Sequence, residues 1–323
     1  MDLAERLLYF RALPAGGAST AQELMPLAEA ATEIFIRRGT TIFAQNEPPE
    51  RFVCIAEGSA QLSIGGLSLG VISAPGVVGI RAVVARAPMP YAVHALEDIS
   101  GLEVGGHRFL ATIEDDFALW KKQLRFQNAA YVQRALITPE ALLGQTLVDL
   151  KGLPTHRYLD LVERMLFVRR IGIFGRGSVN ALAELSQHLE SQTLEPGEIL
   201  FRSGDPAKNI SFLVHGHLVA TLVDGRTVDF LPGTSLGGPE SMADLPHFYQ
   251  AAAKQRSILL SLDLESFFDI VEDNTEMASA FLSGTARVIY EMDVVQMIAT
   301  ARAVMSKTDG APAVEVGRAK NGG

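Results

Sequence analysis

The 323-residue sequence has almost no cysteine and no long hydrophobic run. Its single cysteine, Cys54, excludes an internal disulfide framework and fits a reducing compartment. No apolar run approaches the roughly 18 residues that a membrane-spanning helix needs, so no membrane span is expected. The first residues include Asp2 and Glu5, and no basic region leads into an apolar core there. A signal peptide is therefore not expected, and the sequence predicts a cytoplasmic protein.

The sequence also has fewer positively than negatively charged residues. The chain has 28 lysines and arginines against 37 aspartates and glutamates, a formal net charge of −9, and a pI near 5.3. A large interface with a phosphate backbone needs clustered lysine and arginine, so nucleic acid is not an expected partner. The hydrophobic content of 48% is typical of a globular chain, and the length allows two domains with separate cores.

The sequence repeats itself with a constant separation. Residues of the same type recur 158 positions apart, with a slip of one position near Pro75 and Pro232 that is later recovered. This repeat predicts two copies of one domain in tandem. The matched pairs are Glu5/Glu163, Gly39/Gly197, Phe43/Phe201, Pro48/Pro206, Gly58/Gly216, Pro88/Pro246, Tyr91/Tyr249 and Phe109/Phe267.

Each copy is predicted to begin with two helices and to continue as a β-roll. In the second copy, the strands 218–223 and 226–231 flank Asp224-Gly225, a pair favoured in two-residue hairpins. Short strands at regular intervals indicate a roll or barrel. The expected fold class is α+β, with two tandem jelly-roll-like β-rolls each flanked by helices. The predicted opening helices are Leu3–Phe10, Ala21–Ala31, Glu163–Val168 and Val179–Leu189.

Further helices are predicted behind each roll. Apolar residues at helical spacing indicate helices over Ala111–Leu136 and Thr275–Met305. Thr138-Pro139 is predicted to open another helix that ends near Gly152, since threonine is a good N-cap and proline is tolerated at the first helical position. The predicted divisions are a first domain (1–137), a helical connector (138–160), a second domain (161–305) and a disordered tail (306–323).

The segment 197–218 shows which family the repeated unit resembles. It reads GEILFRSGDPAKNISFLVHGHL, with a glycine turn, an apolar run, the break at Gly204-Asp205 and a second run that closes on Gly216. This pattern resembles the opening strands of the cyclic nucleotide-binding domain of catabolite-activator-type regulators and protein kinase A regulatory subunits. The resemblance covers nearly all of residues 5–305 and implies a helix, a β-roll and closing helices in each copy. No helix-turn-helix, channel, kinase or cyclase segment accompanies the rolls, so a sensor without an attached effector is expected.

The family resemblance also implies where a ligand would bind, and the second copy departs from it there. In the family, a Gly-Glu pair opens a phosphate-binding cassette, the glutamate takes the ribose hydroxyl, and an arginine in an Arg-x-Ala context pairs with the phosphate. In the second copy Gly237 matches the glycine, but Gly238 stands where the glutamate belongs and His247 where the arginine belongs. The cassette is therefore expected to be degenerate.

The first copy departs in the same way. Gly79 is kept, while Ile80 replaces the glutamate and Met89 replaces the arginine. Hydrogen bonds to charged groups contribute about 1.5 to 3 kcal/mol each, so losing both side chains should weaken binding by roughly two to four decades. Ordinary cyclic nucleotide binding is not expected in either copy.

Several nearby residues are candidates to replace the missing contacts. Glu240 could reach a ribose, and His247 could donate to a phosphate when protonated. In the first copy Arg81 and Arg86 could supply the positive charge. The preferred interpretation is that these are surface residues of a loop that no longer binds a ligand.

The matched tyrosines Tyr91 and Tyr249 have two interpretations. They could cap a ligand, or they could fill the emptied pocket, and filling is preferred. His215 and His217 could form part of a metal site, but a third ligand is missing at close spacing, so exposed turn histidines are preferred. Cys54 is interpreted as a core residue rather than a nucleophile. No catalytic or metal-binding residue is predicted.

The sequence predicts a non-enzymatic regulatory or interaction module with weakened or lost cAMP and cGMP binding. The helix 275–305 is the expected surface for a protein partner or for self-association, because it has more apolar area than one small roll can cover. The alternative is a working receptor that binds a nucleotide mainly through backbone groups of Gly237, Gly238 and Glu240. No cofactor is expected, and cyclic nucleotide is kept as a candidate ligand.

Overall fold

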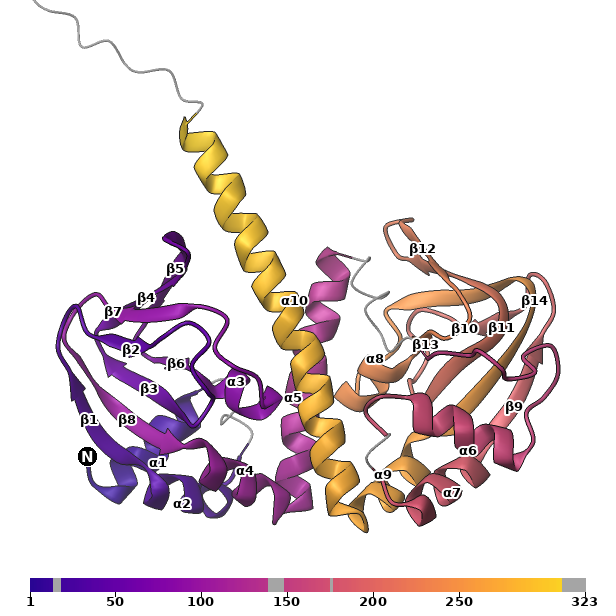
Figure 1. Ribbon diagram of the computed structural model, residues 1–323, viewed down its shortest axis with the longest axis horizontal. Coiled ribbons are helices and arrows are strands. Elements are labelled where there is room, and N and C mark those ends of the chain that lie inside the picture. The colour runs from indigo at the N-terminus through magenta and orange to yellow at the C-terminus, as the bar shows by residue number, and fades with distance from the viewer. Residues whose placement is uncertain (14–18, 139–147, 175–176, 310–323) are drawn as a thin grey trace, which may run out of the picture.

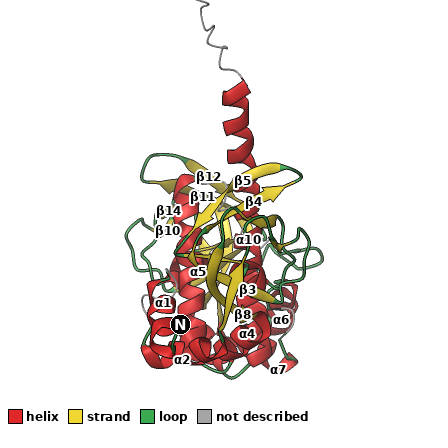
Figure 2. Ribbon diagram, turned by 90° about the vertical axis from the view of Figure 1, so that its left-hand side faces the viewer, coloured by secondary structure: helices red, strands yellow, loops and turns green. Residues whose placement is uncertain are grey.

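The computed structural model describes residues 1–13, 19–138, 148–174 and 177–309. Two β-rolls lie side by side, and the long helices α5 (Phe117–Ile137) and α10 (Thr275–Asp309) run between them (Figure 1). The perpendicular view shows shorter helices gathered at one end of the rolls and α10 projecting beyond the other end (Figure 2). The expected α+β fold with two tandem β-rolls is confirmed.

Within the described residues 1–13 and 19–116, the first roll has eight strands and four short helices. Its strands are β1 (Thr32–Ile36), β2 (Thr41–Phe43), β3 (Arg51–Glu57), β4 (Ser59–Ile64), β5 (Leu67–Ser73), β6 (Gly76–Val78), β7 (Ala92–Ala95) and β8 (Ile99–Gly105). They form two antiparallel sheets with the orders β1-β8-β3-β6 and β2-β7-β4-β5. The helices are α1 (Leu3–Ala12), α2 (Ala21–Ala30), α3 (Ile80–Ala85) and α4 (Gly106–Glu114).

The second roll repeats this plan with longer strands. Its strands are β9 (Leu189–Leu194), β10 (Ile199–Phe201), β11 (Asn209–Leu222), β12 (Thr227–Phe230), β13 (Ser235–Leu236) and β14 (Tyr249–Asp263). The main order is β10-β14-β11-β12, with β13 paired to β11 and β9 to β14. The helices are α6 (Leu161–Arg170), α7 (Val179–His188), α8 (Gly238–Ala243) and α9 (Leu264–Glu272). The predicted hairpin at Asp224-Gly225 joins β11 to β12.

The opening helices of the two copies start with the same cap. In α1 the Asp2 carboxylate accepts from the Glu5 backbone N–H, and the Glu5 side chain accepts from the Asp2 N–H. In α6, Asp160 and Glu163 make the same two hydrogen bonds. Each capping box satisfies backbone donors that would otherwise lack a partner at a helix start. All four predicted opening helices are confirmed to within three residues at each end.

Two glycines at equivalent positions are required by close backbone contacts. Gly58 and Gly216 both have a positive φ, +93° and +99°. A Cβ at Gly58 would lie 2.4 Å from the Asp98 carbonyl oxygen, and one at Gly216 would lie 2.5 Å from the Ser257 Cα. A side chain at either position therefore combines backbone strain with overlap.

We expect Gly216→Ala to lower the free energy of unfolding by roughly 2–4 kcal/mol, because about 1–2 kcal/mol of backbone strain adds to the overlap with Ser257. Gly225→Ala is the matched control, because Gly225 also has a positive φ, +86°, but no atom within 4 Å of its would-be Cβ. Urea unfolding of the two variants measures the difference. Equal losses would contradict the role assigned to the Ser257 contact.

The long helices are exchanged between the rolls. Helix α5 follows the first roll in the sequence but packs against α8 of the second roll. Helix α10 follows the second roll but packs against α3 and β5 of the first roll. Each cassette helix, α3 or α8, is thus covered by the helix that belongs to the other copy.

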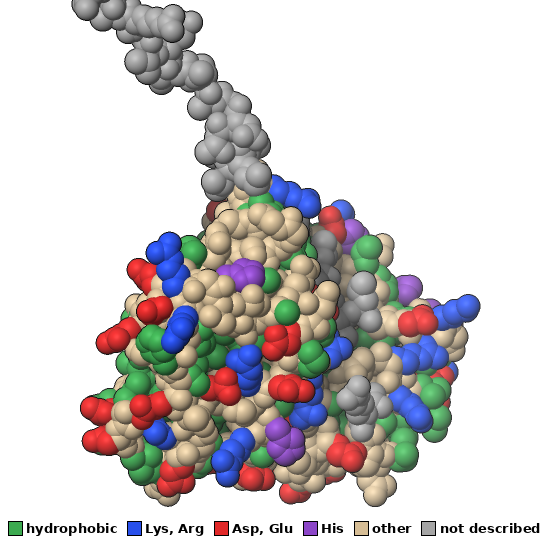
Figure 3. Space-filling model, turned by 60° about the vertical axis from the view of Figure 1, so that its left-hand side comes forward, with side chains coloured by type: hydrophobic (Ala, Val, Ile, Leu, Met, Phe, Trp, Pro, Cys, Tyr) green, Lys and Arg blue, Asp and Glu red, His purple; other side chains and the backbone are tan. Residues whose placement is uncertain are grey.

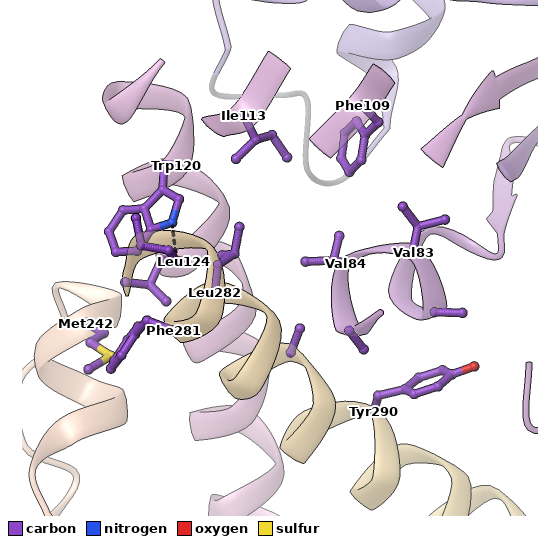
Figure 4. Close-up of a cluster of buried hydrophobic side chains, with 14 of the residues drawn as sticks. Val83, Val84, Phe109, Ile113, Trp120, Leu124, Met242, Phe281, Leu282 and Tyr290 are labelled. Atoms are coloured by element: carbon purple, nitrogen blue, oxygen red, sulfur yellow. Dashed lines mark hydrogen bonds between the residues drawn. The ribbon is translucent and has the colours of Figure 1, made fainter. Parts of the chain in front are cut away.

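The contact at Trp120 shows that this exchange is nearly symmetric. The Trp120 Nε1–H donates to the Ala278 carbonyl oxygen over 3.0 Å (Figure 4). These two residues are 158 positions apart, so they occupy equivalent places in the two copies. An approximate two-fold axis between α5 and α10 relates the two halves of the chain.

The structure corrects several predicted boundaries. The predicted helix Ala111–Leu136 is two helices, because Asp116 interrupts it and caps α5 by accepting from the Ala118 and Leu119 N–H groups. Residues 148–160 contain turns and no helix, so the helical connector is wrong there; its remaining part, 139–147, lies outside the described residues. Helix α10 continues to Asp309, so disorder is wrong for 306–309, and 310–323 lies outside the described residues.

Candidate ligand sites of the two rolls

Both cassette helices begin at a glycine that the geometry requires. Gly237 precedes α8 with φ +78°, and Gly79 precedes α3 with φ +91°. A Cβ at Gly237 would lie 2.9 Å from the Asn209 carbonyl oxygen, and one at Gly79 would lie 3.1 Å from the Arg51 carbonyl oxygen. The positions that matched the family glycine therefore keep the backbone turn that opens the cassette.

In the second roll, two candidate residues meet each other. The His247 Nδ1 lies 3.0 Å from the Glu240 Oε1, and the two side chains are 6% and 0% exposed. The imidazole also stacks on the Phe201 ring, with centroids 3.6 Å apart and planes 4° apart. The interpretation of Glu240 and His247 as surface loop residues is wrong, because both are buried in an internal pair. Gly238 is buried as well.

Tyr249 occupies the interior of the second roll. Its side chain is fully buried, and its hydroxyl accepts from the Gly237 backbone N–H over 3.2 Å. Burial, together with the nearby Glu240 carboxylate, raises the pKa of the Tyr249 hydroxyl well above its ordinary value. The Phe201, Phe230 and Phe248 rings surround it at centroid distances of 5.2, 6.2 and 4.9 Å. This burial agrees with the interpretation that Tyr249 fills the pocket.

In the first roll, the two candidate arginines bind groups of the protein. Arg81, at the start of α3, pairs with the Asp293 carboxylate of α10. Arg86 pairs with Glu114 over 2.6 Å and donates to the Ser279 hydroxyl over 2.8 Å. Both side chains remain about half exposed, at 53% and 46%. Met89, which stands at the family's arginine position, is a buried core residue.

The first roll nevertheless keeps an open cavity beside its cassette. The cavity has a volume of about 340 Å³ and is bordered by Gly79, Arg81 and Tyr91 from the cassette region. Burial raises the pKa of the Tyr91 hydroxyl above its ordinary value. Tyr290 and Met297 of α10 also border it. The structure thus brings three of the four first-copy candidates to one cavity, and Arg86 lies outside it.

The paired histidines of the second roll lie in a strand rather than in an exposed turn. His215 and His217 belong to β11, pair with β14, and are only partly exposed. The His217 Nε2 lies 2.5 Å from the Asp229 Oδ1. Among the described residues, no group of three or more His, Cys, Asp or Glu side chains could hold a metal ion. The prediction of exposed turn histidines is therefore wrong.

Cys54 is a core residue, as interpreted from the sequence. It is fully buried in β3, and burial raises the pKa of its thiol to about 12. We expect the native protein to be unreactive toward a disulfide reagent at pH 8, because the thiolate is scarce and shielded. One thiol should react when the chain is unfolded in urea. Rapid labelling of Cys54 in the folded protein would contradict this prediction.

Sequence reasoning missed the contribution of α10 to the first-roll site. Asp293 and Tyr290 reach the cassette from more than 200 positions along the chain, and no local pattern indicates such a contact. The sequence does contain one indication that the second site is filled by a side chain of the protein. Tyr249 lies two residues after His247, where the family's Arg-x-Ala context has its small alanine.

Comparison with solved structures finds protein kinase A regulatory subunits. The regulatory domain of Toxoplasma gondii protein kinase A with cAMP is 16% identical, with a TM-score of 0.34, over 88% of this chain and 98% of that chain. A mutant regulatory subunit of a cAMP-independent protein kinase A from Trypanosoma brucei, bound to cAMP, is 15% identical, with a TM-score of 0.34, over 96% and 91%. At these values the likenesses carry no functional argument. No curated protein matches the sequence.

The sequence profile of the cyclic nucleotide-binding domain matches the chain twice. The matched stretches are residues 33–116 and 191–274, which together make up more than half of the sequence. Each stretch spans nearly all the strands of one roll and its cassette helix, and the opening helices precede it. The chain belongs to the cyclic nucleotide-binding domain family, with two copies of the domain in tandem.

Proposed function

We propose that this chain is a non-enzymatic regulatory module in which cyclic nucleotide binding is lost from the second roll and weakened in the first. The observation that carries the proposal is the hydrogen bond from the Gly237 N–H to the Tyr249 hydroxyl. In the family, backbone N–H groups at this point meet the phosphate. Here a fully buried side chain of the protein takes one of these donors, so a ligand would have to displace it.

The charges in the second cassette also oppose an anionic ligand. A buried phosphate needs hydrogen-bond donors and a fixed positive charge. The Glu240 carboxylate is fully buried in the cassette helix, and its partner is His247 rather than an arginine. Entry of a phosphate would separate this pair and leave a buried carboxylate next to another anion, which is strongly unfavourable. These contacts speak against the alternative of a nucleotide receptor that uses Gly237, Gly238 and Glu240.

A regulatory module without a working second site would act through protein contacts. Helix α10 has an exposed apolar side chain, Val295, which is 68% exposed. On the face drawn in Figure 3, acidic and basic side chains are interspersed. Together with the net charge of −9, this surface favours a protein partner or a second copy of the chain over nucleic acid.

The cytoplasmic location stays a prediction. No helix among the described residues is long and apolar enough to cross a membrane.

Isothermal titration calorimetry with cAMP and with cGMP tests the proposal. We expect no measurable heat of binding at micromolar ligand concentrations, because Tyr249 fills the second cassette and the first cassette lacks both the glutamate and the arginine of the family motif. A protein kinase A regulatory subunit serves as the positive control for the ligand solutions. Micromolar binding by the natural protein would contradict the proposal.

A further inference from the structure

The cavity of the first roll is built mainly from apolar side chains. Its volume, about 340 Å³, lies at the lower end of the range of roughly 300–1,000 Å³ that small-molecule sites occupy. Leu62, Leu69 and Ile72 line it from β4 and β5, and Met89 lines it from the cassette region. None of the described residues that border the cavity is acidic. The ribose hydroxyls of a nucleotide would therefore find no carboxylate acceptor there.

One positive charge at the edge of this cavity is not fully neutralised. Arg81 borders the cavity and pairs with Asp293, and Arg134 of α5 pairs with the same carboxylate. Two guanidinium groups share one carboxylate that is only 5% exposed, so the three side chains together carry a single positive charge. The Arg81 side chain is about half exposed, so its guanidinium can donate hydrogen bonds to a further anion.

Helix α10 closes the other side of the cavity. Tyr290, Asp293 and Met297 follow one another at spacings of three and four, so they lie on one face of the helix. Tyr290 extends from α10 toward α3 (Figure 4), and its hydroxyl donates to the Pro88 carbonyl oxygen over 3.4 Å. A molecule in the cavity would therefore contact both the first roll and the helix that belongs to the second copy.

We propose that this cavity binds a small monoanionic carboxylate with an apolar body. The carboxylate would engage Arg81, and the body would pack against Leu62, Leu69 and Ile72 beneath Met297. A volume of about 340 Å³ is in the range of small-molecule sites and is large enough for a medium-chain fatty acid or an aromatic acid. This inference goes beyond the proposed function and does not depend on it.

Titration calorimetry with decanoate, below its micelle concentration, and with uncharged decanol tests the inference. We expect saturable decanoate binding at a one-to-one ratio and weaker binding of decanol. Arg81→Met is expected to weaken decanoate binding roughly ten- to a hundredfold, the effect of losing a hydrogen bond to a charged group, and to leave decanol binding unchanged. Leu69→Trp should fill the cavity and abolish binding of both probes.

The matched control is Val223→Trp, which adds the same side chain at a position of the second roll that is 81% exposed. It should bind decanoate like the natural protein, and circular dichroism verifies that each variant is folded. The inference is overturned if decanoate does not bind, if Leu69→Trp binds it normally, or if Arg81→Met has no effect. Displacement of decanoate by micromolar cAMP would contradict the proposed function, which predicts only weakened binding in the first roll, while leaving this site in place, so the two failures are distinguishable.

Discussion

A variant with four changes in the second cassette, Gly238→Glu, Glu240→Ala, His247→Arg and Tyr249→Ala, is expected to bind cAMP at least two decades more tightly than the natural protein. The first and third changes supply the two charged contacts of the family, which are worth about 1.5 to 3 kcal/mol each. The Tyr249 change frees the Gly237 N–H and empties the interior of the roll. Calorimetry with cAMP measures the gain.

The control is the variant with only Gly238→Glu and His247→Arg, for which we expect no measurable heat of cAMP binding. An arginine at position 247 would pair with the buried Glu240 carboxylate, and Tyr249 would still fill the pocket. Because truncating a buried aromatic residue costs about 3–5 kcal/mol, thermal unfolding must show that the four-change variant is folded. Equal cAMP binding by both variants would contradict the blocking role of Tyr249.

Phe281→Ala is expected to lower the free energy of unfolding by about 3–5 kcal/mol. Phe281 is fully buried where α10 meets α5, on the same side as Trp120 (Figure 4). Its ring lies 4.8 Å from the Phe267 ring, 5.4 Å from the Phe174 ring and 6.5 Å from the Trp120 ring. Its loss would leave a cavity between the two halves of the chain. Urea unfolding followed by the fluorescence of Trp120, the only tryptophan, measures the effect at this junction.

Phe126→Ala is the matched control, because Phe126 lies on α5 but is 40% exposed. It should cost less than about 1 kcal/mol, as surface substitutions usually do. A small loss for Phe281→Ala, similar to that for Phe126→Ala, would contradict the view that the exchanged helices form a common core for both rolls.

The features that the sequence predicts correctly are local ones. The four opening helices and the Asp224-Gly225 hairpin are set by residues within a few positions of one another. The structure adds the capping pairs Asp2/Glu5 and Asp160/Glu163, which are equally local. The sequence predicts the duplication because each copy needs the same turn glycines at the same separations. The sequence also predicts the glycine that opens each cassette, Gly79 or Gly237, since a side chain there would overlap a backbone carbonyl.

The features that the sequence does not predict depend on distant contacts. The long helices cross to the opposite rolls, so Asp293 reaches Arg81 and Trp120 reaches Ala278. The pairing of Glu240 with His247 joins residues seven positions apart across a helix and a loop, and reading each alone suggested an exposed side chain. Burial of these polar residues follows from the tertiary packing, and neither spacing nor composition indicates it.

The most direct test of the account is the backbone amide of Gly237. In protein labelled with nitrogen-15 at glycine, the resonances of Gly237 and Gly79 report separately on the two cassettes. We predict that the Gly237 resonance does not shift when cAMP is added in excess, because the Tyr249 hydroxyl already holds this N–H. A saturable shift of the Gly237 resonance with cAMP would contradict the central claim that the second roll is closed by its own side chains.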